Sequence, residues 1–128
     1  MAPVRLLIAD DHPAARDSLV RAVGGPDVEV VAVLADGRSA LDAARMLHPD
    51  VALLDLRMPV MSGAEVAREL RREGSSTLVI ILSAFDEPSV VEWVLRAGAI
   101  AFLSKEATAD EISAVVARCG VRRGPPVD

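Results

Sequence analysis

The chain has 128 residues, 52% of them hydrophobic and 2% aromatic, with 14 basic and 19 acidic side chains for a formal net charge of −5. This length predicts one domain with one core; the single cysteine, Cys119, excludes an internal disulfide, and an acidic chain with few rings is a poor nucleic-acid binder by itself. The sequence has no apolar run approaching the roughly 20 residues of a membrane span and no signal-peptide pattern, so we expect a cytoplasmic domain.

Five short apolar runs of strand length alternate with segments of helical periodicity. The runs are rich in Val, Ile and Leu and cover residues 4–9, 28–34, 51–54, 78–82 and 100–103. Because their apolar character is continuous rather than alternating, we expect strands that are covered on both faces, as in a parallel sheet.

The segments after these runs carry apolar or small residues at the i, i+3, i+4, i+7 spacing of a helix. This spacing is clearest at residues 63–70, 91–98 and 112–119, and weaker around Leu19 and Leu41. Start and stop signals agree with the spacing: Pro13 is expected to open the first helix and residues 24–26 to end it.

Capping signals mark the later helices. Thr108 followed by Glu111 predicts a capping box, and Gly74 and Gly98 follow helical segments where a left-handed cap is expected. Residues 120–128 have no periodic pattern and are expected to be a tail, or the start of a linker to an output domain outside this chain, after a domain at residues 1–119.

The order of elements is (βα)5, which predicts an α/β fold with a doubly wound, five-stranded parallel sheet. Strands joined by helices must be parallel, with right-handed crossovers. Five such units form an open sheet, because a closed barrel needs eight. We expect the flavodoxin-like strand order 2-1-3-4-5.

Polar side chains follow four of the predicted strands. They are Asp10, Asp11 and His12 after the first, Asp55 after the third, Ser83 after the fourth and Lys105 after the fifth. Ligands bind at the carboxyl ends of strands in open parallel sheets, and a charge at the end of an apolar run is costly unless it is used or paired. We therefore expect these residues to meet on one rim.

These residue types together suit phosphoryl chemistry. Three carboxylates repel one another unless a cation is present, and hard oxygen ligands without a His or Cys cluster at ligand spacing favour Mg²⁺. The ammonium of Lys105 and the hydroxyl of Ser83 can stabilise phosphoryl oxygens. One carboxylate then remains as a nucleophile, and aspartyl-phosphate is an established covalent intermediate.

The motifs at these strand ends resemble those of a known family. The pair Asp10-Asp11, the run Asp55-Leu56-Arg57-Met58-Pro59 continuing to Gly63, Ser83 and Lys105 resemble the receiver domain of two-component response regulators, over roughly residues 3–119. Each motif alone is weak, but all of them in order on successive strand ends are specific. Residues 9–13, 96–99 and 102–108 are most similar to the NarL-like branch, whose members usually carry a DNA-binding helix-turn-helix after the receiver.

The resemblance implies a role for each matching residue. Asp55 is implied as the phosphoacceptor, with Asp10, Asp11, Asp55 and the backbone carbonyl of Arg57 as Mg²⁺ ligands. Ser83 and Lys105 match the family's hydroxyl and lysine that act with the phosphoacceptor.

The resemblance also implies a reaction and partners. A sensor histidine kinase would phosphorylate Asp55, and slow self-catalysed hydrolysis would follow, so the chain is not expected to be an enzyme acting on a separate substrate. Phosphorylation would pull in Ser83, with Phe102 at the position of the family's rotating aromatic. The surface of the fourth helix, fifth strand and fifth helix would then change, promoting homodimer formation or DNA binding through a separate output domain.

Several residues have a simpler interpretation. The charged set could be a structural ion-pair network, and Asp10 or Asp11 could cap a helix. His12 is expected to orient the loop into the first helix rather than serve as phosphodonor or metal ligand. Phe102 could be plain core, and Trp93 is either an interface residue or simple packing. His48 is expected at an exposed helix end and Cys119 in the core or an interface.

Rival functions remain open on the sequence. A small phosphatase with an aspartate nucleophile would normally carry an acid/base aspartate two residues later, but position 57 is arginine. A stand-alone receiver acting through protein contacts, or a degenerate receiver used as a fixed binding module, fits the same fold. A nucleotide-binding domain is disfavoured because no glycine-rich fingerprint follows the first strand. In the family that the sequence resembles, the positions two after the phosphoacceptor and two after the hydroxyl tune the lifetime of the phosphoryl group. The resemblance therefore implies that bulky Arg57 and Phe85 at these positions retard its hydrolysis.

Overall fold

The computed structural model describes residues 2–122, which form five strands and five helices in strict alternation. The strands are β1 (Val4–Ala9), β2 (Val28–Leu34), β3 (Val51–Asp55), β4 (Leu78–Ser83) and β5 (Ala101–Ser104). The helices are α1 (Pro13–Val23), α2 (Gly37–Leu47), α3 (Gly63–Arg72), α4 (Pro88–Ala97) and α5 (Ala109–Arg122). No helix among these residues is both long and apolar enough to cross a bilayer.

All neighbouring strands pair in parallel, in the order β2-β1-β3-β4-β5. This confirms the predicted α/β doubly wound fold and its flavodoxin-like order. The chain passes from β1 outward to β2 and then returns past β1 to β3. The direction of winding therefore reverses between β1 and β3, where such sheets bind their ligands.

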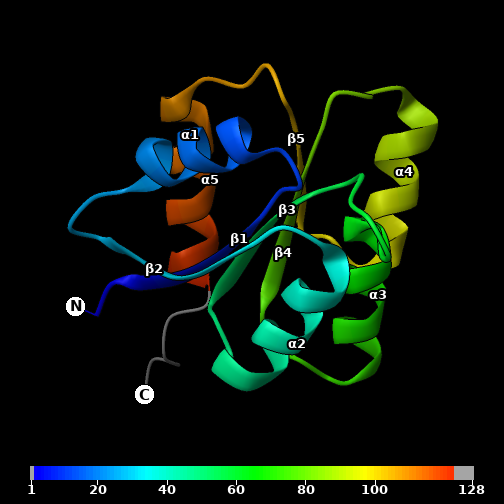
Figure 1. The fold of residues 1–128 in the computed structure, drawn as a ribbon, viewed down its shortest axis with the longest axis horizontal. Coiled ribbons are helices and arrows are strands. Elements are labelled where there is room, and N and C mark those ends of the chain that lie inside the picture. The colour runs from blue at the N-terminus through cyan, green and yellow to red at the C-terminus, as the bar shows by residue number, and fades with distance from the viewer. Residues whose placement is uncertain (1, 123–128) are drawn as a thin grey trace.

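Helices cover both faces of the sheet (Figure 1). One core lies between the sheet and α1 with α5, and the other between the sheet and α2, α3 and α4. Alternate residues of a strand serve opposite cores: in β1, Leu6 and Ile8 face the first, while Leu7 and Ala9 face the second. This two-sided burial explains why the central strands read as unbroken apolar runs.

The two edge strands pack against both cores, as expected, but their burial is less complete than the continuous apolar runs predicted. β2 and β5 each have one neighbouring strand, and they are only partly buried. Val33 of β2 is 42% exposed. An edge strand lies at the border of the helical layers, so an apolar sequence there does not ensure burial.

The predicted capping signals of the later helices and the predicted bounds of the first helix are confirmed. The backbone N–H of Thr108 donates to Glu111 and that of Glu111 donates to the Thr108 hydroxyl, which also lowers the pKa of Glu111. Gly74 and Gly98 both adopt positive φ, at 72° and 122°. α1 begins at Pro13 and ends before Gly24 as predicted.

The predicted end of the last helix is too early. α5 continues through Gly120 to Arg122, three residues beyond the expected boundary at Cys119. Gly120 lies against β1 so closely that a Cβ there would fall 2.2 Å from Cγ2 of Val4. A glycine in a helical sequence usually signals an end, but here it permits close approach of the helix to the sheet. Residues 123–128 of the expected tail lie outside the described residues.

Candidate functional site

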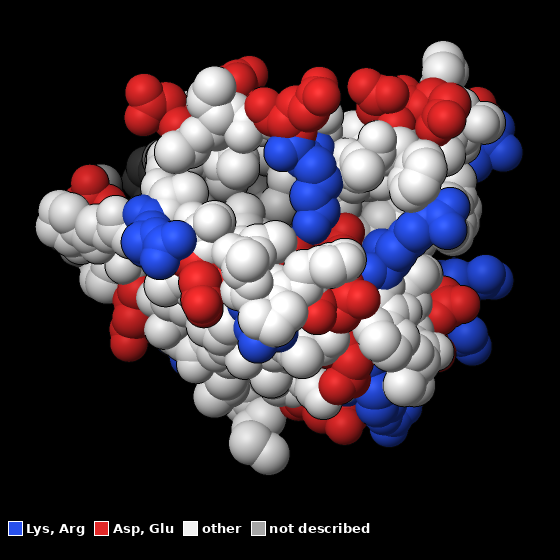
Figure 2. Space-filling view, turned by 45° about the horizontal axis from the view of Figure 1, so that its top comes forward, with Lys and Arg blue, Asp and Glu red and all other residues white. Residues whose placement is uncertain are grey.

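The predicted site residues lie at the carboxyl ends of β1, β3, β4 and β5, beside the reversal of strand order. Each element positions its residue by ending there: β3 ends at Asp55 and β4 at Ser83. The backbone joins these ends, because the N–H of Lys105 donates to the carbonyl of Ser83 at 2.9 Å. Figure 2 looks toward this end of the molecule, where acidic side chains gather along the rim with basic side chains among them.

An ammonium group and two buried carboxylates form the centre of the site. Lys105 Nζ donates to Asp10 Oδ2 at 2.6 Å and lies 3.6 Å from Asp55 Oδ1. Asp10 is fully buried and Asp55 is 5% exposed. Lys105, the only lysine in the chain, thus spans 95 positions of sequence to pair with the end of β1.

The surroundings of Asp55 disfavour its negative charge. Burial raises the pKa of Asp55 to about 6, and the charges of Asp10 and Asp11 add to this rise. The ammonium of Lys105 and the backbone N–H of Arg57 act in the opposite direction. The site therefore holds more negative charge than its own residues neutralise, and a cation or a proton would relieve it.

The donor set fits a divalent metal ion. Asp10, Asp11, His12 and Asp55 each offer one ligand atom within 4.8 Å of the others. Oδ1 of Asp11 is buried and has no hydrogen-bond partner among the described residues. A buried carboxylate oxygen without a hydrogen bond is costly, and a bound cation would satisfy it. Carboxylate oxygens are the ligands that Mg²⁺ prefers.

Ser83 lies in the same site but points to its own loop. It is 1% exposed, and its hydroxyl oxygen accepts a hydrogen bond of 3.0 Å from the backbone N–H of Phe85. The hydroxyl thereby fixes the start of the β4–α4 loop. Any new acceptor at Asp55 would compete with this arrangement for the Ser83 side chain.

Arg57 and Phe85 cover the site from the two neighbouring loops. The guanidinium of Arg57 lies over the Phe85 ring, 4.4 Å from its centroid. Below them is a cavity of about 350 Å³ whose lining includes Asp55, Ser83 and Lys105. Asp55, Ser83 and Lys105 therefore line one open cavity, together with Arg57 and Phe85.

The structure also shows residues that the sequence did not single out. Arg16, on the first turns of α1, donates from Nη1 to the backbone carbonyl of Asp10 at 3.0 Å and so holds the end of β1. An arginine six positions after an aspartate carries no recognisable signal. Ser62 and Glu65 form a full capping box at the start of α3; here the Ser-x-x-Glu pattern was present.

Other candidates lie away from the carboxylates. Phe102 is partly buried and packs against the core under α2, α3 and α4, while Trp93 is 49% exposed on α4. His48 is exposed after α2 with φ of 48°, as expected for a helix end. Cys119 is buried in the core that α1 and α5 share.

Comparison with known proteins gives a consistent family. The response regulator receiver domain model matches residues 6–117. The chain is 44% identical over 121 residues to the "Probable transcriptional regulatory protein NarL" of Mycobacterium tuberculosis, covering 94% of this chain and 56% of that protein. It is 42% identical over 105 residues to the nitrate/nitrite response regulator protein NarP of Escherichia coli, covering 81% and 49%.

Solved structures agree with these relatives. The signal receiver domain of a NarL response regulator from Mycobacterium tuberculosis superposes with a TM-score of 0.92 at 43% identity, covering 94% of this chain and 98% of that one. A DNA-binding response regulator of the LuxR family from Staphylococcus aureus gives a TM-score of 0.85 at 28% identity, covering 91% and 98%. The chain spans about half the length of the curated relatives that it matches.

Proposed function

The chain belongs to the response regulator receiver family, in the NarL-like branch, and from this we propose that it is a phosphorylation switch whose phosphoacceptor is Asp55. The observation that carries the proposal is that two buried carboxylates, Asp10 and Asp55, lie 2.6 and 3.6 Å from the same ammonium, Lys105 Nζ. Asp11 adds a third carboxylate, whose buried Oδ1 makes no hydrogen bond and has its ion-pair contact with Nδ1 of His12 at 3.0 Å.

Asp10, Asp11, Asp55 and the backbone carbonyl of Arg57 would hold Mg²⁺. The ion would neutralise part of the charge that gathers when a phosphoryl group meets three carboxylates. Asp10 is shared in this arrangement: its Oδ2 binds Lys105, and its Oδ1 accepts the backbone N–H of His12 at 2.9 Å.

In the proposed step, a carboxylate oxygen of Asp55 attacks the phosphorus of a donor. The donor is a phosphohistidine of a sensor kinase; its P–N bond breaks as the P–O bond to Asp55 forms, and the imidazole leaves and takes a proton from solvent. Lys105 Nζ is close enough to Asp55 to move onto a phosphoryl oxygen. Water later hydrolyses the acyl phosphate, which restores Asp55 and releases phosphate.

Ser83 and Lys105 would link this event to the surface. A phosphoryl oxygen on Asp55 would be a charged acceptor for the hydroxyl proton of Ser83. By turning toward it, the hydroxyl would release the N–H of Phe85. That N–H begins the loop into α4. α4 buries only Val94 fully, and its N-cap residue Glu87 makes no side-chain capping bond, whereas α3 buries five residues and has a capping box.

The weak attachment of α4 makes it the element most easily displaced. We propose that phosphorylation shifts a pre-existing equilibrium and changes the surface of α4, β5 and α5, with Phe102 following. The receiver would extend to the end of α5 at Arg122, and the residues after it would lead toward an output domain that binds DNA, as the names of similar proteins suggest. Homodimer formation on phosphorylation and a cytoplasmic location belong to the same proposal.

The test is the covalent adduct itself. The chain is incubated with acetyl phosphate or phosphoramidate and Mg²⁺, and its intact mass is measured. One hydroxylamine-sensitive phosphoryl adduct is expected, absent in Asp55→Asn and retained in Asp42→Asn, an exposed aspartate on α2. The proposal fails if no adduct forms or if the adduct persists in Asp55→Asn.

A further inference from the structure

The ring of His12 faces the carboxylates instead of capping the helix that it precedes. His12 is the N-cap residue of α1, but its side chain makes no capping hydrogen bond. Nδ1 lies 3.0 Å from Asp11 Oδ1 and 3.4 Å from Asp10 Oδ1. The expectation that His12 only orients the loop therefore does not explain where its side chain points.

The three atoms are spaced as ligands of one ion would be. Two neighbouring ligands of an octahedral ion, each about 2.1 Å from it and at right angles, are separated by about 3.0 Å. Asp11 Oδ1 lies at this distance from Nδ1, although it makes no hydrogen bond within the described part of the chain. Nδ1 can carry a proton or bind a metal ion. Asp11 Oδ1 would accept a hydrogen bond in the first case and bind the same ion in the second.

The other basic side chains at the site bind different oxygen atoms from those that face His12. Lys105 takes the opposite oxygen of Asp10, Oδ2, and Arg16 binds only the backbone carbonyl of that residue. The imidazole is 71% exposed, so it can adjust to an incoming ion without disturbing the core. Within residues 2–122, His12 is the only member of this ligand cluster that offers a nitrogen atom.

We propose that His12 is an additional ligand of the metal site and gives it a preference for later first-row transition ions such as Co²⁺ and Ni²⁺ over Mg²⁺. Imidazole suits these later ions, whereas carboxylate, carbonyl and water suit Mg²⁺ and Mn²⁺. The inference rests on the proposed function in one respect, namely that a divalent ion occupies this carboxylate site. The ion that serves phosphoryl transfer would then depend on which cation is available.

Pulsed EPR of Mn²⁺ bound to the full chain tests the ligand directly. The chain contains two histidines, His12 and His48, so a ¹⁴N imidazole coupling in the parent protein should vanish in His12→Ala and persist in His48→Ala. His12→Asn should also lose it, while keeping a favoured N-cap residue in case the alanine variant folds poorly.

Calorimetric titration tests the preference. Removing His12 should weaken Co²⁺ and Ni²⁺ binding at least about tenfold, the lower end of what losing even an outer partner costs, and change Mg²⁺ affinity less than twofold. Binding of Mn²⁺ without imidazole coupling, or equal losses for all three ions, would overturn the role of His12 and leave the proposed function intact. Failure of every ion to bind the parent chain would overturn both.

Discussion

Arg57 lies over the ring of Phe85, with its guanidinium carbon 4.4 Å from the ring centroid. The two residues come from different loops, two positions after Asp55 and two after Ser83. Both are exposed on their outer sides and line the cavity above Asp55. The pair therefore borders the cavity in which water would meet a phosphoryl group on Asp55.

Arg57→Ala or Phe85→Ala should shorten the half-life of the acyl phosphate, because each removes half of this cover. A cation–π contact at an exposed position is worth about 0.5–1 kcal/mol, which corresponds to about a two- to fivefold change in rate. In the double variant, the half-life should shorten by less than the product of the two single effects, because both substitutions remove the same contact.

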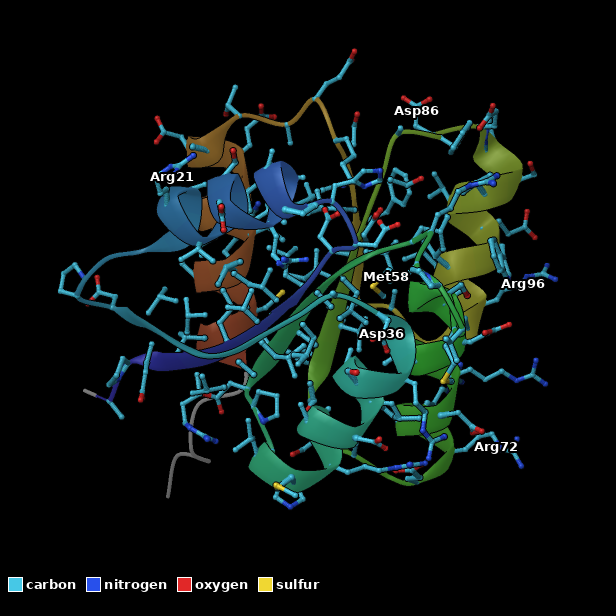
Figure 3. The ribbon with its side chains drawn as sticks, viewed as in Figure 1. Arg21, Asp36, Met58, Arg72, Asp86 and Arg96 are labelled. Atoms are coloured by element: carbon cyan, nitrogen blue, oxygen red, sulfur yellow. The ribbon has the colours of Figure 1, made fainter. Side chains whose placement is uncertain are left out.

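The half-life is measured by intact mass after removal of the phosphodonor. Arg72→Ala is the matched control, because Arg72 is an exposed arginine at the other end of α3 (Figure 3). Unchanged half-lives in both single variants would show that the pair does not exclude water.

Asp55→Asn should stabilise the metal-free protein at pH 8, by about 1–3 kcal/mol. The folded-state pKa of Asp55, about 6, lies above the ordinary value of 3.8, so the folded protein holds this proton more tightly than the unfolded chain. The stability that Asp55 contributes is therefore fully present below pH 3.8 and is lost as pH rises through about 6.

Urea unfolding of both proteins in a chelating buffer, from pH 4 to pH 8, measures this effect. The advantage of Asp55→Asn should grow across that range, because the amide cannot ionise. Asp42→Asn, on the exposed face of α2, should follow the pH dependence of the parent chain. An advantage for Asp55→Asn that is equally large at pH 4 and pH 8 would contradict the assigned titration.

Gly63→Ala should destabilise the fold and slow phosphorylation together. A Cβ at Gly63 would fall 2.6 Å from the backbone carbonyl oxygen of Asp55 and 2.9 Å from Cδ1 of Ile81. Backbone cannot yield as a flexible side chain can, so the start of α3 or the end of β3 must move. Overpacking of this kind costs about 1–3 kcal/mol.

Gly25→Ala is the control, since nothing lies within 4 Å of its Cβ position. Urea midpoints and initial rates of adduct formation are compared for the two variants. An unchanged urea midpoint and adduct-formation rate in Gly63→Ala would mean that α3 lies farther from Asp55 than the 2.6 Å distance to its carbonyl oxygen indicates.

Val60→Gly should stabilise the protein by about 1 kcal/mol. Val60 has φ of 73°, in the left-handed region where a β-branched residue is strained, and the N–H of Met61 bonds to the carbonyl of Pro59 across it. Strain of this kind costs the folded state about 1–3 kcal/mol. The extra freedom of glycine in the unfolded chain offsets about 0.5–1 kcal/mol of the stability gained by relieving it. The side chain is 81% exposed, so no core contact is lost.

Val60→Ala provides the comparison at the same backbone position. It lacks the branched Cβ but keeps a Cβ, so thermal and urea midpoints should rise from valine to alanine to glycine. A glycine variant less stable than the parent chain would show that the left-handed conformation of Val60 is not strained.

Periodicity and spacing determined most of the architecture in advance. The order of elements fixed a parallel doubly wound sheet, because helical crossovers permit only parallel neighbours. The carboxyl ends of the strands then had to meet on one rim, so the approach of Asp10, Asp55 and Lys105 to one another was predictable from local sequence alone.

Two features, the exposure of an edge strand and the end of α5, depend on tertiary packing and not on local sequence. Whether a strand lies at an edge depends on its neighbours in space, so the exposure of Val33 was missed. The extension of α5 past Gly120 depends on Val4, which is more than a hundred residues earlier. Both outcomes follow from contacts between segments that are remote in the chain.

The sequence by itself thus determined which chemical groups gather at the rim of this protein, because each follows a strand whose apolar pattern is visible. The tertiary structure alone decided how they pair: Lys105 with Asp10 at 2.6 Å and with Asp55 at 3.6 Å, and the ring of His12 toward Asp11. Such differences of about an ångström come from the register and twist of strands packed between two helical layers, and no residue pattern records them.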